Sequence, residues 1–138
     1  MSISTTRPPS LPPLRNVLVV GGGGREQALA WAFRRCPEIE GIWISPGNAG
    51  TSDLEGCTPL AIAETDHECM VSACSDHAID LVVIGPEAPL AAGLADTLRE
   101  QGFAVFGPSA EGAQLEASKA WAKQLMQEAG IPTAGYWT

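Results

Sequence analysis

The sequence predicts an α/β domain built on a parallel sheet that is flanked by helices. Three observations predict this class. Short apolar runs alternate with segments of helical period along most of the 138 residues. The first run, residues 16–20, has four consecutive apolar positions, as in strands that are buried on both faces. That run ends at four glycines, Gly21 to Gly24, and a helical pattern begins directly after them.

The remaining elements each have a local signal. The apolar face of the first helix repeats at Leu29, Phe33 and Cys36, and Pro37 ends it because proline cannot continue the hydrogen-bond ladder. Trp31 is expected to pack against other residues. The expected strands are 16–20, 41–45, 58–63, 79–84 and 103–106. The expected helices are 24–35, 66–77, 89–101, 109–116 and 118–129, and residues 133–138 are expected to be extended.

Composition excludes several classes of protein. The net charge of -8 argues against nucleic acid as the main partner, since a phosphate backbone needs a basic face. Four cysteines without a CxxC pair argue against a zinc site or a disulfide framework and favour free thiols in the cytoplasm. The longest apolar runs are too short to span a membrane, and residues 1–14 form a proline-rich lead-in, expected to be disordered, without a signal-peptide core.

The turns after four of the expected strands share a composition. They read GGGGRE, SPGNAG, GPEAPL and FGPSA, and each is rich in residues that form turns. Because ligands of parallel sheets bind beyond the carboxyl ends of the strands, these turns are expected to lie along one rim. A helix that begins after a glycine turn points unpaired N–H groups at that rim, so the expected ligand is an anion, in the first instance a phosphorylated small molecule.

A dinucleotide is disfavoured at this rim. The G-x-G-x-x-G fingerprint fails, because Glu26 stands where the third glycine belongs. The second strand ends in Ile44, Ser45 and Pro46, without the acidic residue that would bind the ribose hydroxyls of NAD.

Four polar side chains are candidates for contact with the ligand. Arg25 could donate a fork of hydrogen bonds to a phosphate, and Glu26 could accept from sugar hydroxyls or an amine. Glu87 lies in a proline-rich turn just past a buried strand, and Asn48 lies in a Gly-Asn-Ala-Gly turn. Each also has a plain structural interpretation: solvated charges for Arg25 and Glu87, a helix-dipole contact for Glu26, and tolerance of left-handed angles for Asn48.

Four segments carry a specific resemblance to a known family. They are VLVVGGGGREQALAW (17–31), SPGNAGT (45–51), IDLVVIGPEAPLAAGLADTLRE (79–100) and FGPSAEGAQLEASKAWAKQLMQEAGIPTAGY (106–136). In order and spacing they resemble the amino-terminal region of the phosphoribosylamine–glycine ligases, also called glycinamide ribonucleotide synthetases. The resemblance covers residues 15–138.

The resemblance implies an ATP-grasp ligase of purine biosynthesis. Such enzymes join the carboxyl of glycine to the amine of 5-phosphoribosylamine through a glycyl phosphate, using ATP and Mg²⁺ or Mn²⁺. It implies a Rossmann-like pre-ATP-grasp domain at 15–108, followed at 109–138 by linker helices and the truncated start of an ATP-grasp domain. The full-length family member is expected to be a cytoplasmic monomer with 5-phosphoribosylamine, glycine and ATP as its ligands, and without nucleic-acid or membrane partners.

Site residues carry over by position from this family. Lys119 matches a lysine that reaches the phosphates of ATP. No catalytic residue and no metal ligand is expected within these 138 residues, so the chain is expected to bind the substrate without catalysing the ligation. The residues implied to face 5-phosphoribosylamine are Gly22, Gly23, Gly24, Arg25, Glu26, Pro46, Gly47, Asn48, Ala49, Gly50, Gly85, Pro86, Glu87 and Leu90.

The chain departs from the family at one motif position and in length. Gln27 stands where the family has histidine after Arg-Glu, so a hydrogen bond could persist there but proton transfer could not. The ATP-grasp body is absent, so helix 118–129 is expected to expose an apolar face. Two alternatives stay open: a stand-alone module that binds a phosphorylated metabolite, and the corresponding domain of another ATP-grasp ligase. The coding sequence after Thr138 would separate them.

Overall fold

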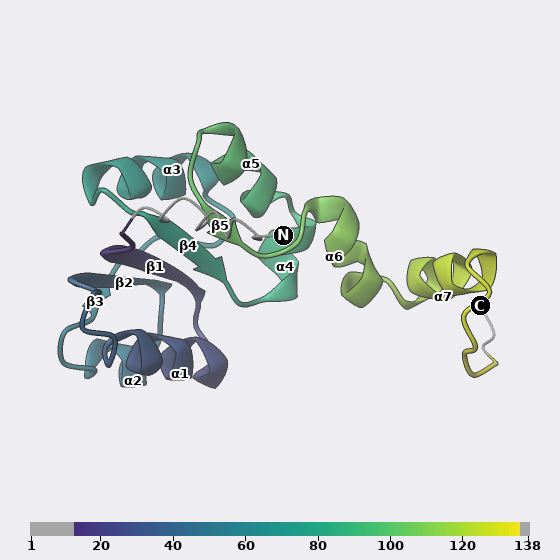
Figure 1. Cartoon of the computed structure of the whole chain (residues 1–138), viewed down its shortest axis with the longest axis horizontal. Coiled ribbons are helices and arrows are strands. Elements are labelled where there is room, and N and C mark those ends of the chain that lie inside the picture. The colour runs from purple at the N-terminus through teal and green to yellow at the C-terminus, as the bar shows by residue number, and fades with distance from the viewer. Residues whose placement is uncertain (1–12, 136–138) are drawn as a thin grey trace, which may run out of the picture.

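The computed structural model of the chain describes residues 13–135. It contains a five-stranded parallel sheet in the order β3-β2-β1-β4-β5 (Figure 1). The strands are β1 (Asn16–Gly21), β2 (Gly41–Pro46), β3 (Thr58–Pro59), β4 (Leu81–Ile84) and β5 (Val105–Phe106). The helices are α1 (Gly24–Phe33), α2 (Ala49–Ser52), α3 (His67–Asp76), α4 (Glu87–Ala91), α5 (Leu94–Glu100), α6 (Ala110–Ala117) and α7 (Lys119–Glu128). The predicted α/β class with a parallel sheet is confirmed.

Strand β1 lies at the centre of the sheet and is buried on both faces. Its side chains alternate between two apolar clusters: Leu18 and Val20 face one of them, and Val17 and Val19 face the other. Helices α3, α4 and α5 supply the first cluster, and α1 supplies the second. Figure 1 shows these two groups of helices on opposite sides of the sheet. The continuous apolar run in the sequence therefore correctly indicated a strand that is buried on both faces.

Several predicted boundaries are wrong, and glycine and proline explain two of them. The single helix predicted over 89–101 is two helices, because Gly93 takes a left-handed conformation (φ 88°) between α4 and α5. The strand predicted over 58–63 is reduced to Thr58–Pro59; proline has no N–H with which to extend the ladder. The strands predicted over 79–84 and 103–106 begin two residues later, since the N–H groups of Ile79 and Phe103 close the helices before them.

The apolar face of α1 is rotated from the predicted one. Leu29 and Phe33 are partly buried against the second cluster as predicted, but Cys36 is exposed and Ala30 is buried instead. The rotation follows Glu26, whose side chain is buried one turn before Ala30. Trp31 is consequently 51% exposed, and its ring stacks under the Arg35 guanidinium at 4.6 Å, so the prediction that it packs into the protein is wrong.

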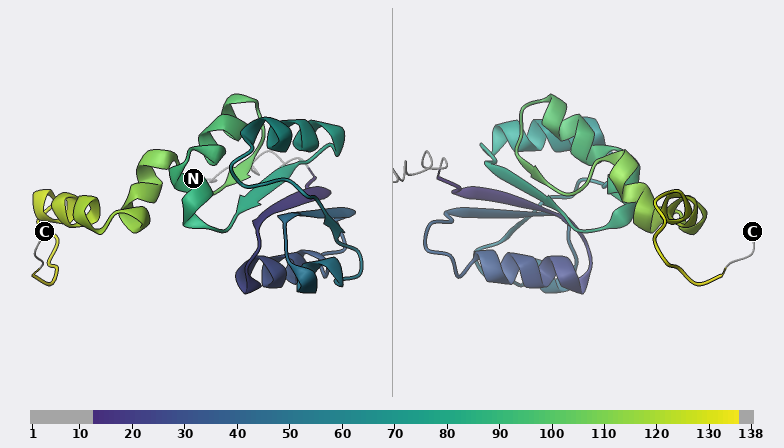
Figure 2. Two further views of the ribbon diagram at one scale, coloured as in Figure 1. Left: turned by 180° about the vertical axis from the view of Figure 1, so that it is seen from behind. Right: turned by 45° about the vertical axis from the view of Figure 1, so that its right-hand side comes forward.

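The last two helices form an arm. Helix α6 packs against α4, whereas α7 makes its main contacts with α6 and stands away from the sheet in both views of Figure 2. Leu115 and Leu125 on this arm are exposed. Each helix begins one residue after its predicted start, because the serine there is the cap: Ser109 accepts a hydrogen bond from the N–H of Gly112, and Ser118 accepts one from the N–H of Trp121.

Two stretches of the predictions lie wholly or partly outside the described residues: the lead-in up to residue 12, and residues 136–138 of the expected extended tail. No helix within residues 13–135 is both long enough and apolar enough to cross a membrane.

Candidate functional site

The turn after β1 is the centre of the candidate site. Gly21 has a φ of 134°, a left-handed value that favours glycine, and Gly23 precedes the first residue of α1. A Cβ at Gly21 would lie 2.5 Å from Cγ of Glu26 and 2.9 Å from Cδ of Pro86. The turn therefore needs glycine both for its backbone conformation and because the third turn, at Pro86, approaches it closely.

Glu26 fills the space behind this turn. The residue is only 2% exposed, although it carries a carboxylate. Its Oε2 accepts a hydrogen bond from the backbone N–H of Gly23 at 2.8 Å, and its Oε1 accepts one from Nε of Arg25 at 2.9 Å. Burial raises the pKa of Glu26, but the hydrogen bonds from Arg25 and Gly23 outweigh burial and hold the pKa below its ordinary value. Glu26 is therefore a buried anion with its partners in place.

Arg25 joins the first turn to the third. Nε donates to Glu26, and Nη2 donates to the backbone carbonyl of Gly85, which follows β4. The side chain remains 60% exposed, so its Nη1 hydrogens and the second Nη2 hydrogen stay available at the surface. The hydrogen bond to Glu26, with the charges of Glu26, Glu87 and Glu116, raises the pKa of Arg25. A permanently charged group with spare N–H donors lies at the rim, as an anion site requires.

The turn after β2 is tied to the glycine turn. Nδ2 of Asn48 donates to the carbonyl of Gly22 at 2.8 Å, and the N–H of Gly47 donates to the carbonyl of Gly21. The other side of the Asn48 amide caps α2 by accepting from the N–H of Thr51 at 3.0 Å. Asn48 has extended backbone angles and Gly47 takes the left-handed conformation, so the left-handed interpretation of Asn48 is wrong. Asn48 holds the two turns together.

Gln27 and Thr51 complete the contact between these turns. A Cβ at Gly50 would lie 2.6 Å from Nε2 of Gln27, so the Gln27 side chain rests on the second turn. Thr51 is 1% exposed, and its hydroxyl accepts from the N–H of Asn48 at 2.7 Å. The four-residue helix α2, which we had not predicted from the sequence, begins here.

The turn after β4 presents one exposed carboxylate and one buried apolar anchor. Pro86 precedes α4, and Glu87 is the first residue of that helix and is exposed. Leu90 is 6% exposed and lies in the core under the fourth turn, where a Cβ at Gly107 would come within 2.8 Å of it. Of the two predicted contacts, Glu87 can reach a ligand with its side chain, whereas Leu90 supports the turn from beneath.

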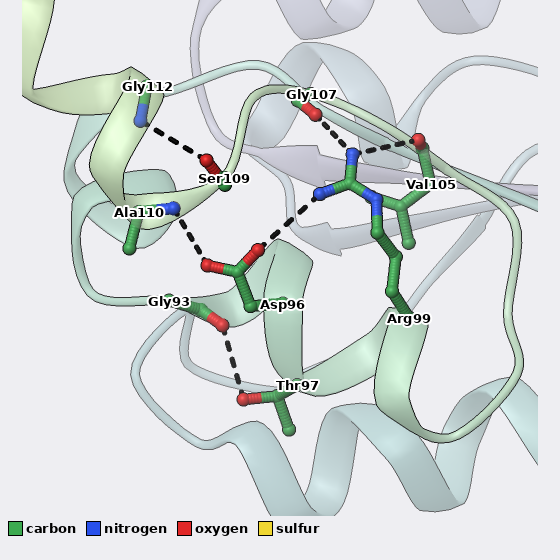
Figure 3. Close-up of polar contacts among 9 residues, drawn as sticks. All are labelled: Gly93, Asp96, Thr97, Arg99, Val105, Gly107, Ser109, Ala110 and Gly112. Carbon is green, nitrogen blue, oxygen red and sulfur yellow. Dashed lines mark hydrogen bonds and ion pairs between the residues drawn. The ribbon is translucent and has the colours of Figure 1, made fainter.

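The turn after β5 is held by two side chains of α5 (Figure 3). Oδ2 of Asp96 accepts from the backbone N–H of Ala110, the first residue of α6, at 2.7 Å. Arg99 donates to the carbonyl of Val105 at 3.3 Å and to the carbonyl of Gly107. The two side chains also form an ion pair at 3.6 Å. Together they fix both ends of the FGPSA turn and the start of α6.

Two further carboxylates surround the centre. Burial, together with the charge of Glu26, raises the pKa of Glu64, which lies between β3 and α3. Glu116, near the end of α6, acts on the charge of Arg25. Glu116 therefore adds to the negative charge that Arg25 experiences.

Lys119 is not brought to these turns. It is the exposed first residue of α7 and follows the cap residue Ser118. Its predicted contact with ATP phosphates stays a prediction. Within residues 13–135, no group of three or more His, Cys, Asp or Glu side chains lies together as a metal ion would need.

Sequence reasoning missed Thr51, Asp96 and Arg99. The spacing from Asn48 to Thr51 is that of a capping box, which could have indicated a helix start at Asn48. The DTLR segment places Asp96 and Arg99 at i and i+3 on one helix face, but nothing in the sequence says that this face meets the next turn. His67 lies away from these turns; it is partly buried, and a ring nitrogen is 3.2 Å from the Thr97 hydroxyl.

Comparison with known proteins points to one family. Residues 15–116 match the family described as phosphoribosylglycinamide synthetase, N domain. The chain is 56% identical over 118 residues to a phosphoribosylamine--glycine ligase of Nostoc sp., a match that covers 86% of this chain and 28% of that protein. It is 48% identical over 118 residues to the human trifunctional purine biosynthetic protein adenosine-3, of which it covers 12%. The chain thus spans little more than a quarter of the length of the bacterial relative.

A solved structure supports the fold. The glycinamide-RNase-transformylase T of Mycobacterium tuberculosis superposes with a TM-score of 0.66 at 19% identity, over 89% of this chain and 35% of that one. At this identity, the likeness concerns the fold alone.

Proposed function

Because this chain belongs to the phosphoribosylglycinamide synthetase N-domain family, we propose that it is the substrate-side domain of a ligase that joins glycine to 5-phosphoribosylamine. The products are glycinamide ribonucleotide, ADP and phosphate. The whole ligase uses ATP and a divalent metal ion, and we propose that the metal ligands and most of the ATP contacts lie in the part of the family's chain that these 138 residues do not span. Catalysis belongs to the whole ligase, and binding of the phosphoribosyl substrate belongs to this domain.

One observation carries the proposal: the turns after β1, β2 and β4 are bound to one another around a single exposed arginine. Asn48 ties the second turn to Gly22, and Arg25 ties the first turn to Gly85. Arg25 keeps free N–H donors, and the start of α1 adds backbone N–H groups beside it. These donors suit a phosphate. Glu87, which is exposed on the third turn, is placed to accept from sugar hydroxyls or from the amine.

Three features of the proposal rest on the family and on sequence composition. We propose a cytoplasmic location, supported by four free cysteines among the described residues. We propose that the whole ligase is a monomer. We also propose that Lys119 reaches the nucleotide phosphates in the whole ligase, supported by its exposed position at the start of α7.

Calorimetric titration of the chain with ribose 5-phosphate tests the binding proposal. Heat of binding is expected, and it should weaken at high salt because the contact is ionic. Arg25→Ala should reduce the affinity about tenfold or more, since a hydrogen-bonded charge is lost. Arg35→Ala is the matched control, because Arg35 follows the same helix but lies over Trp31. Absence of heat with ribose 5-phosphate, together with clear binding of NADH, would contradict the proposal.

An assay of ADP formation tests the division of labour. With glycine, 5-phosphoribosylamine, ATP and Mg²⁺, the chain alone is expected to form no ADP above background. Addition of the remaining domains of a relative should be needed for turnover. Turnover by the 138 residues alone would overturn this part of the proposal.

A further inference from the structure

Glu26 is the charged residue that the fold buries most completely among the described residues. A carboxylate that bound sugar hydroxyls or an amine would need to reach the ligand. This one is 2% exposed, and both of its oxygens already accept hydrogen bonds from the protein. Its position does not suit direct contact with the substrate.

The structure around Glu26 is shaped to admit its side chain. A Cβ at Gly85 would lie 2.6 Å from Cδ of Glu26, and a Cβ at Gly21 would lie 2.5 Å from its Cγ. Two glycines of separate turns therefore leave room for one carboxylate. A buried charge of this kind is costly unless it is paired, and Glu26 is paired with the side chain that offers N–H groups to the rim.

We propose that Glu26 is a positioning residue that acts through Arg25, and that it holds the guanidinium in the one orientation in which its spare N–H groups face a phosphate. Glu26 fixes Nε, and the carbonyl of Gly85 fixes Nη2. With two of its five N–H groups held, the planar group cannot rotate, and three donors remain for the ligand. The inference rests on the proposed function and deepens it, since it assigns the recognition of the phosphate to an oriented Arg25 rather than to Glu26.

Charge and geometry predict opposite results for Glu26→Gln. Removal of a negative charge near the phosphate would by Coulomb's law tighten binding. Loss of positioning would weaken it, because Gly23 and Arg25 donate to different oxygens of the carboxylate, and in glutamine one of these is an NH2 group that cannot accept. Glu116→Gln is the matched control, because Glu116 acts on Arg25 through its charge, whereas Glu26 acts on it through both its charge and a hydrogen bond.

A double-mutant cycle on ribose 5-phosphate affinity tests the proposal. Glu26→Gln should weaken binding about fivefold to tenfold in the wild-type background and leave it unchanged in the Arg25→Ala background. Glu116→Gln should leave binding unchanged or tighten it. Equal weakening in both backgrounds would show that Glu26 only supports the turn, and unchanged or tighter binding of Glu26→Gln in the wild-type background would also overturn the proposal.

Two additional measurements keep the test independent of folding and of the proposed function. Arg25→Lys keeps the charge at an exposed position but loses the fork that Glu26 and Gly85 hold, so it should bind more weakly than the wild type; wild-type affinity would contradict positioning. If the wild-type chain does not bind ribose 5-phosphate, the proposed function fails. Positioning is then decided by the NMR signal of the Arg25 Nε–H, which Glu26→Gln should shift and Glu116→Gln should not. An Nε–H signal unchanged in Glu26→Gln would overturn it.

Discussion

The first and fourth turns of the rim are held by the same chemical groups, but at very different burial. In the first turn, Glu26 caps a backbone N–H and Arg25 donates to the carbonyl of Gly85. In the fourth turn, Asp96 caps the N–H of Ala110 and Arg99 donates to two carbonyls. The carboxylate of the first pair is 3% exposed and that of the second is 38% exposed.

This difference in burial indicates that the pair of Glu26 and Arg25 contributes more to stability than the pair of Asp96 and Arg99. The buried pair of Glu26 and Arg25 lies where the first three turns of the rim meet. It holds these turns together, and it leaves N–H donors of Arg25 available to a ligand. In the exposed pair, shown in Figure 3, Arg99 donates to backbone carbonyls of the fourth turn only. Asp96 accepts from the N–H of Ala110 and so fixes the start of α6. Water screens the second pair, so its removal should cost less. Substitutions at the two turns test this ordering.

Gly85→Ala should have the largest effect. The new Cβ would collide with the buried carboxylate of Glu26 and force it from its partners. We expect a loss of about 3 kcal/mol in the free energy of unfolding, measured with urea. Gly24→Ala is the control, since nothing lies within 4 Å of its added Cβ and the helix gains from alanine. If Gly85→Ala lowers the free energy of unfolding by as much in a Glu26→Ala background as in the wild type, then the added Cβ does not collide with Glu26.

Glu26→Gln should have the next largest effect and should change the response to acid. Because the pKa of Glu26 is lowered on folding, its stabilising contribution is present above its unfolded value of 4.5. That contribution is lost as the pH falls through the folded pKa. We expect Glu26→Gln to be about 1–2 kcal/mol less stable than the wild type at pH 7. The gap should narrow only as the pH falls below 4.5 and through the folded pKa, and a gap that does not change with pH would exclude this role.

Asp96→Ala should cost less, about 1 kcal/mol, which is the value of a helix cap. Thermal unfolding should show this as a decrease of about 4 °C in the midpoint. Asp96→Asn keeps an acceptor for the N–H of Ala110 and should recover most of the loss. If Asp96→Ala lowers the stability more than Glu26→Gln does, the buried pair is not the stronger of the two, which would contradict the comparison.

Arg99→Lys should have the smallest effect, a few tenths of a kcal/mol. Lysine keeps the charge beside Asp96 but cannot bond two carbonyls with a planar fork. Hydrogen exchange at Gly107 and Ala110 gives a finer measure, because the turn should open more often in the variant. Unchanged exchange at both amides would show that Arg99 does not hold this turn.

The sequence predicted most of the fold because its signals are local. The apolar run before Gly21 indicated the central strand, and serines 109 and 118 indicated two helix starts correctly. Local patterns could not show that the side chain of Glu26 is buried. Its burial depends on the space left by Gly21 and Gly85, which are distant in sequence and both lie against that side chain. The rotation of α1 and the exposure of Trp31 follow from the same contact.

The candidate site was predictable as a set of turns but not as a network. Composition alone identified GGGGRE, SPGNAG, GPEAPL and FGPSA as turns of one rim. It did not say that Asn48 would bond to Gly22 or that Asp96 would cap another helix, because both contacts join residues distant in sequence. Which residues touch the ligand stays a prediction.

Mapping of backbone amide shifts during titration with ribose 5-phosphate tests the central claim most directly. If the rim binds the phosphoribosyl group, the largest shifts should fall at Gly22–Glu26 and at the turns beginning at Pro46 and Gly85, and Arg25→Ala should abolish them. Shifts confined to the groove between α3 and α5, lined by His67 and Thr97, or no shift at high ligand concentration, would contradict it.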